Sequence, residues 1–128
     1  MTQKPFLEVK NLNVAFPTED GLVQASNDIS FSVARGETLA VVGESGSGKS
    51  VTSLAVMGLH DRKRTQITGQ AFLNLDSGPV DVISADEEVV RKLRGKAMSM
   101  IFQDPMSALH PYYSIGNQLI EAWSLYNE

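Results

Sequence analysis

The chain has 128 residues, which is enough for one modest hydrophobic core and too few for two ordinary domains. Its composition, 42% hydrophobic and 20% charged, is that of a globular protein, and the absence of cysteine excludes disulfides and thiolate metal sites. The 11 basic and 15 acidic residues give a formal charge of −4, which carries no signal for nucleic-acid binding.

The first part of the chain is predicted to form antiparallel strands. Residues 7–16 alternate between apolar and polar side chains, and Pro17 with a polar turn at residues 19–21 ends that strand. A second strand, at about residues 23–26, is expected to return as its hairpin partner. Residues 29–33 alternate again and end at a turn.

The pattern changes after this turn. Residues 38–42 are continuously apolar after Thr38, which predicts a strand buried on both faces of a parallel sheet. A glycine-rich loop follows at once, and residues 50–59 have a helical composition. This order predicts a strand, a loop and a helix in succession.

Residues 69–75 and 80–83 predict another antiparallel pair around a turn. Residues 84–87 fit a capping box, so we expect a helix from about Ala85 to Leu93 that ends at Gly95. Glu87 and Glu88 are then helix N-terminal charges, not a catalytic pair.

The last part of the chain continues the mixed pattern. We interpret residues 97–102 as a second buried strand, residues 103–113 as a loop whose His110 is a surface residue, and residues 115–126 as a helix.

Residues 1–10 lack the apolar segment of a secretory signal. The longest apolar run, residues 39–42, is far shorter than the roughly 20 residues needed to cross a bilayer. If the protein works at a membrane, we expect it to do so through a partner.

The glycine-rich loop carries the strongest functional signal. Residues 43–50, Gly-Glu-Ser-Gly-Ser-Gly-Lys-Ser, fit the pattern G-x-x-x-x-G-K-[ST] at every fixed position. Glycines let the backbone N–H groups approach phosphate oxygens, and a helix that begins near Lys49 aims its unpaired N–H groups at the same anion. Lys49 is expected to reach the β- and γ-phosphates, and the Ser50 hydroxyl to take one position on Mg²⁺. The sequence therefore predicts nucleotide binding.

The residues around the loop resemble the ATP-binding subunits of ABC transporters. The resemblance is carried by residues 43–51 and by Met-Ile-Phe-Gln-Asp-Pro-Met at 100–106, and it continues through residues 31–39 and 114–119. The branch that the chain resembles imports oligopeptides, dipeptides, nickel or glutathione. The resemblance implies an α/β fold, namely a P-loop NTPase core of the ABC ATPase type with an N-terminal antiparallel β subdomain. Residues 1–128 would be the N-terminal part of one such domain, ending at the start of its helical subdomain.

The resemblance also implies roles for individual residues. Phe16 stands where the family places an aromatic ring that stacks on adenine, although a core aromatic at a strand end is the alternative. Gln103 matches the Q-loop glutamine, which contacts Mg²⁺ and the attacking water. Lys49 and Gln103 would thus act in catalysis, and Ser50 and Gln103 at the metal. The implied nucleotide contacts are Phe16, Gly43, Ser45, Gly46, Ser47, Gly48, Lys49, Ser50 and Val51.

Several parts that the family needs for catalysis are absent from these 128 residues. The sequence contains no Leu-Ser-Gly-Gly-type signature, no apolar strand ending in Asp-Glu and no later switch histidine. We therefore expect a truncated chain that binds ATP and Mg²⁺ but does not hydrolyse ATP alone. Because the parallel sheet would lack strands, we also expect marginal stability or aggregation.

The expected partners of the parent protein follow from the resemblance. They are a second ATPase subunit, identical or different, membrane-spanning subunits contacted through the Q-loop region and, indirectly, a solute-binding protein. We expect a peripheral position on the cytoplasmic side of the plasma (inner) membrane and no nucleic-acid partner. Two alternatives remain: a nucleotide-binding module without turnover, and another phosphate-loop class such as a kinase or GTPase. The context of Gln103 and the antiparallel strands before the loop disfavour the latter.

Overall fold

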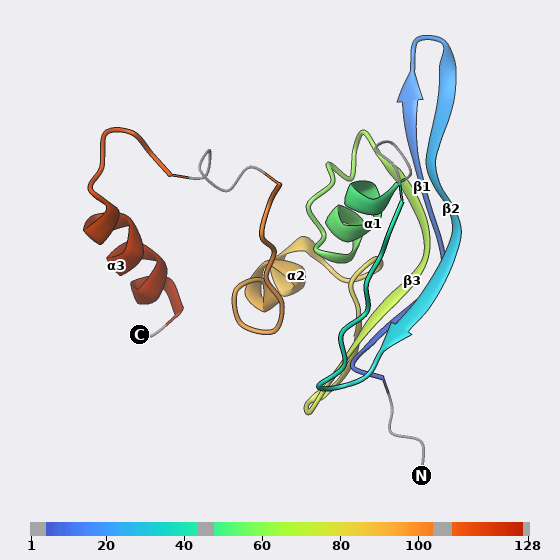
Figure 1. Cartoon of the computed structure of the whole chain (residues 1–128). Helices are drawn as coiled ribbons and strands as arrows, with labels where there is room; N and C mark the ends of the chain where they lie inside the picture. The colour runs from blue at the N-terminus through green and yellow to red at the C-terminus, as the bar shows by residue number, and fades with distance from the viewer. Residues whose placement is uncertain (1–4, 44–47, 104–108, 127–128) are drawn as a thin grey trace. The chain divides into compact units, whose positions relative to one another are not determined.

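The computed structural model describes residues 5–43, 48–103 and 109–126, and it divides the chain into two compact units, Met1–Arg91 and Lys92–Glu128. The first unit is built on a four-stranded sheet (Figure 1). Its strands, in the spatial order β2-β1-β3-β4, are all antiparallel to their neighbours. Their bounds are β1 Leu7–Thr18, β2 Gly21–Val33, β3 Gln66–Leu75 and β4 Gly78–Asp81. The antiparallel β subdomain predicted from the sequence is therefore confirmed, with the two short strands expected at 23–26 and 29–33 joined into one.

A bulge interrupts the long pair of β1 and β3. Lys10 pairs with Gln70 and Asn13 pairs with Thr68, so two residues of β1 lie opposite Gly69 alone. A Cβ at Gly69 would collide with the carbonyl oxygen of Asn11, whose own φ is 49°. The bulge therefore needs glycine at position 69, and it changes the side-chain alternation of β1 between its two halves.

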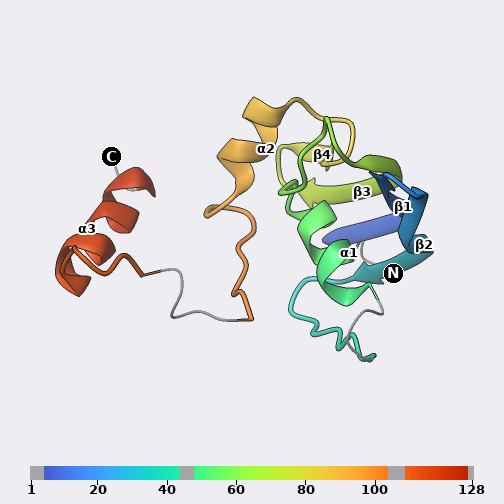
Figure 2. The same cartoon turned by 90° about the horizontal axis from the view of Figure 1, so that it is seen from above.

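One helix closes the core of this unit. Helix α1, Lys49–Val56, lies over one face of the sheet (Figure 2). The buried side chains that meet there come from β1, β3 and α1, and they are Val9, Leu12, Val14, Ala55 and Ala71. The predicted helix was longer, to residue 59, but α1 ends in a Schellman motif: the Gly58 N–H donates to the Ala55 carbonyl at 3.1 Å and the Leu59 N–H to the Leu54 carbonyl at 2.9 Å.

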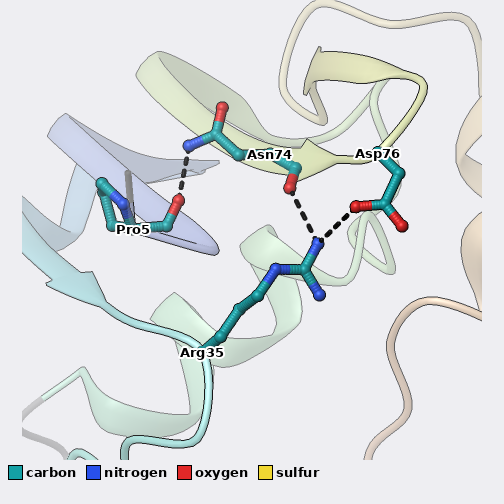
Figure 3. A network of polar contacts seen from close by, with 4 residues as sticks. All are labelled: Pro5, Arg35, Asn74 and Asp76. Carbon is teal, nitrogen blue, oxygen red and sulfur yellow. Dashed lines mark hydrogen bonds and ion pairs between the residues drawn. The ribbon is translucent and has the colours of Figure 1, made fainter. Parts of the chain in front are cut away.

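A polar network ties the turn after β2 to the β3–β4 hairpin (Figure 3). The Arg35 guanidinium donates to Asp76 at 3.2 Å and to the Asn74 carbonyl at 3.5 Å. The Asn74 amide donates to the Pro5 carbonyl at 2.6 Å. Because both partners of the ion pair are exposed, we expect it to orient the turn more than to stabilise the fold. The turn after β2 begins the segment that leads to the phosphate loop.

The two predicted buried strands are wrong in this structure. Residues 38–42 and 97–102 form no strand, and apart from the single bridge between Arg94 and Met98 they pair with no strand of the described chain. Val42 and Ile101 are each 88% exposed. A strand of a parallel sheet is stable only between neighbouring strands that pair with it and under helices that cover it, and the described residues supply neither. Apolar composition alone therefore does not make these segments strands.

The remaining helices match the predictions in position. Helix α2, Glu87–Leu93, has Glu87 and Glu88 in its first turn as expected, but the capping box is wrong because the Ser84 hydroxyl donates to Asp81 at 3.0 Å. The helix begins at Glu87, and the Asp86 carbonyl accepts the Val90 N–H at 3.1 Å. Helix α3 spans Ile115–Tyr126, as predicted.

Candidate nucleotide-binding site

The described ends of the phosphate loop are held together by its lysine. The Lys49 ammonium donates a hydrogen bond to the carbonyl oxygen of Gly43, which is the first residue of the motif. Ser45, Gly46 and Ser47, three of the predicted phosphate contacts, lie outside the described residues. This contact places the Lys49 ammonium next to Gly43, at the start of α1.

Gly48 sets the direction in which the chain enters α1. It is the N-cap residue, with a φ of 95°, and no side chain caps the helix there. A Cβ at this position would lie 2.7 Å from the carbonyl oxygen of Ala25 in β2. Glycine at position 48 therefore allows the chain to pass close to β2 where it enters α1, and the positive end of the helix dipole lies at this point.

A part-buried hydrogen bond fixes α1 on the sheet near the start of the helix. The hydroxyls of Ser26 in β2 and Thr52 in α1 are 2.9 Å apart, and Ser26 is only 4% exposed. Ser50, two residues earlier in the helix, is exposed. The helix start is thus anchored on one side by Ser26, while the predicted metal ligand Ser50 faces solvent.

Phe16 lies near the end of β1 and is half-buried against the core cluster. Its ring centroid is 5.5 Å from that of His60, at an interplanar angle of 72°. His60 in turn is 2.9 Å from the Val51 carbonyl through its Nε2. The structure thus connects two predicted site residues, Phe16 and Val51, through a histidine that the sequence analysis missed. No periodicity or motif in the sequence distinguishes His60, because it follows the end of α1 in an irregular segment.

Gln103 belongs to the second unit, where it is exposed. The residues that follow it, 104–108, lie outside the described part of the chain. Phe16, Gly43, Gly48, Lys49, Ser50 and Val51 all belong to the first unit. The predicted joint role of Ser50 and Gln103 at a metal therefore stays a prediction.

Ion pairs outside the loop involve both carboxylates at the start of α2. Glu87 contacts Arg62 at 3.6 Å and Glu88 contacts Arg91 at 2.5 Å. The hydrogen bond from Arg91 to Glu88 and the charge of Glu88 raise the pKa of Arg91. Among the residues that the structure describes, no group of three or more His, Asp or Glu side chains could hold a metal ion.

Comparison with known proteins identifies the family. Residues 26–125, which include the loop and α1, match the model of the ABC transporter family. The chain belongs to that family. The resemblance predicted from the loop and from the residues around Gln103 is therefore confirmed.

Individual ABC relatives agree with the import branch. The chain is 48% identical over 120 residues to the oligopeptide transport ATP-binding protein OppD of Escherichia coli, and 44% identical over 122 residues to that of Haemophilus influenzae. It is 43% identical over 128 residues to the glutathione import ATP-binding protein GsiA of Pectobacterium atrosepticum. These matches cover 94%, 95% and 98% of the chain but only 34%, 36% and 20% of the relatives. The chain thus spans about a third of the length of the oligopeptide relatives.

No helix in the described ranges is long and apolar enough to cross a membrane.

Proposed function

We propose that the chain binds Mg²⁺ and ATP as the phosphate-binding part of an ABC transporter ATPase. The observation that carries the proposal is the start of α1, where Gly48 leads into a helix without a side-chain cap and Lys49 donates to Gly43. The positive end of a helix and an ammonium then lie at one place, which is an arrangement that binds a polyphosphate.

The described residues fit the triphosphate group. Lys49 would exchange its bond to the Gly43 carbonyl for a charge-assisted bond to a phosphate oxygen. Exposed Ser50 would hold Mg²⁺ with its hydroxyl. Bound Mg²⁺ supplies charge neutralisation between neighbouring phosphates. Phe16, half-buried near the end of β1, would stack on the adenine ring.

The activity of the whole protein follows from the family. We propose that residues 1–128 are the N-terminal part of one ABC ATPase domain and that the complete domain hydrolyses ATP to drive import of a peptide-class solute. The Gln103 region would contact the membrane-spanning subunits on the cytoplasmic side of the membrane, and a second ATPase subunit would complete the site. The names of the oligopeptide and glutathione import relatives support the solute class. A nucleotide-binding module without turnover is the alternative for these 128 residues.

The test is equilibrium binding of ATP to the 128-residue chain, with and without Mg²⁺, with phosphate release measured in the same samples. Replacing Lys49 by Ala removes a charge-assisted contact that contributes about 1.5–3 kcal/mol, so we expect the dissociation constant to rise about tenfold to a hundredfold. Lys92→Ala is the matched control, because it removes the same charge from an exposed position of helix α2. Equal affinities of the Lys49→Ala variant and the unsubstituted chain would refute the proposal. Phosphate release by the unsubstituted chain would refute the view that these residues need further parts for catalysis.

A further inference from the structure

His60 contacts both halves of the proposed ATP site. On one side its ring meets Phe16 with centroids 5.5 Å apart, and on the other its Nε2 lies 2.9 Å from the carbonyl oxygen of Val51. Val51 belongs to α1, directly after Lys49 and Ser50. One half-buried side chain therefore connects the helix that would hold the phosphates with the ring that would hold the base.

The connection to α1 is well fixed. A carbonyl oxygen only accepts hydrogen bonds, so Nε2 of His60 carries the proton and donates it. The acceptor is held in place because α1 is bound to β2 through the hydroxyls of Thr52 and Ser26 at 2.9 Å and buries Ala55 in the core. The orientation of the His60 ring therefore follows that of the helix.

The contact with Phe16 leaves room for a base. The two rings meet edge to face, at 72°. Whichever ring presents its edge, at least one face of Phe16 is not covered by His60. Phe16 also packs against the core cluster, and its partner across the hairpin, Val23, is 52% exposed. An edge-to-face neighbour is favourable in its own right and restricts the torsion of the phenyl ring.

We infer that His60 is a positioning residue for base recognition: anchored on Val51, it holds the Phe16 ring in the orientation that stacks on adenine. The inference rests on the proposed function, because it assumes that Phe16 is the adenine platform. It assigns to His60 no contact with the nucleotide. Its effect should accordingly appear in the affinity for the base and not in the affinity for the phosphates.

The experiment compares two ligands of the 128-residue chain in Mg²⁺: ATP, and inorganic tripolyphosphate, which has the phosphates but no base. We expect His60→Ala to weaken ATP about threefold to tenfold, which corresponds to loss of an aromatic contact, and to leave tripolyphosphate unchanged. His60→Phe keeps a ring but not the donor, so it should recover part of the ATP affinity. In the Phe16→Ala background, His60→Ala should change ATP affinity no further, because the residue acts only through Phe16.

The outcomes separate this inference from the proposed function. Equal weakening of both ligands by His60→Ala means that His60 only supports the fold, and it overturns the inference. An effect of His60→Ala that persists in the Phe16→Ala background also overturns it. If Phe16→Ala weakens ATP selectively but His60→Ala does not, the adenine platform stands and His60 has no part in it. An unsubstituted chain that binds neither ligand overturns the proposed function and this inference together.

Discussion

At the scale of single residues, Gly48 shows how the phosphate motif depends on the sheet next to it. Pattern matching explains this glycine by the approach of a phosphate. The structure adds a second reason, because the space that a Cβ would fill lies 2.7 Å from the Ala25 carbonyl of β2. The backbone at Gly48 thus passes close to the backbone of β2 in the absence of any ligand. The glycine serves the fold as well as the site.

Gly48→Ala should destabilise the chain by about 2 kcal/mol or more, through a left-handed φ of 95° and a collision with Ala25. Gly36→Ala is the matched control, because Gly36 has a φ of 75° but no atom within 4 Å of its ideal Cβ. That control should lose only about 1 kcal/mol. Urea denaturation followed by circular dichroism gives both free energies of unfolding. Equal losses in the two variants would mean that the close approach to Ala25 has no energetic effect.

At the scale of elements, the strands, helices and turns that depend on a local sequence pattern could be predicted from the sequence. The alternation in β1 and β3, the helical pattern of α3 and the turns between strands are encoded within each segment, and all were placed within a few residues. The β1 bulge at Gly69 was not predicted, because it depends on which residues of two distant strands lie opposite each other. The predicted strand at 38–42 failed for a related reason: an apolar run becomes a strand only when neighbouring strands pair with it.

In the candidate site too, residues in a local motif could be predicted, and residues that depend on contacts between distant segments could not. The phosphate loop was recognised because its motif is contiguous in sequence, and the family match includes the loop, while its contacts with a nucleotide stay a prediction. His60 was missed because Phe16 is far from it in the chain and no motif connects it with Phe16 or Val51. Gln103 was recognised only through the residues that flank it. Residues that act through contacts between distant segments can be identified only from a structure.

Within the second unit, Gln118 connects α3 to the loop before it. Its amide nitrogen donates to the carbonyls of His110 and Tyr113 at 3.1 and 2.9 Å, and its amide oxygen accepts the His110 N–H at 2.9 Å. A helix of 12 residues is marginal alone, so these bonds should contribute to its order. We expect Gln118→Ala to speed amide exchange of residues 115–120 about fivefold, the equivalent of roughly 1 kcal/mol.

Asn117→Ala is the control for this prediction. Asn117 is the neighbouring exposed amide, and its described hydrogen bond runs from the backbone N–H to the Ser114 hydroxyl at 3.2 Å, which alanine retains. Hydrogen exchange measured by mass spectrometry resolves the two variants. If both speed exchange to the same degree, the effect comes from changing any side chain in the first turn and not from the Gln118 bonds.

At the scale of the whole molecule, large apolar side chains remain exposed. Val41 is 60% and Val42 88% exposed in the segment before the loop, and Ile101 is 88% exposed in the segment before Gln103. Five large apolar side chains of α3 are also more than 60% exposed: Ile115, Leu119, Ile120, Trp123 and Leu125. Exposed apolar segments with unpaired backbone groups favour association. We therefore expect the 128-residue chain to associate with itself as its concentration rises.

The double substitution Val42→Thr and Ile101→Thr tests this expectation, because it adds hydroxyls to two segments without changing the charge. Burial of two such side chains in a self-association contact is worth roughly 2–3 kcal/mol, so the variant should need at least about tenfold higher concentration to associate. Sedimentation velocity over a concentration series measures the shift. Val23→Thr, in the paired strand β2 at 52% exposure, is the control and should change association little. A chain that stays monomeric throughout the series and melts in a sharp, reversible transition would show that the exposed segments are not the source of instability, and that the β subdomain with α1 is a stable unit by itself.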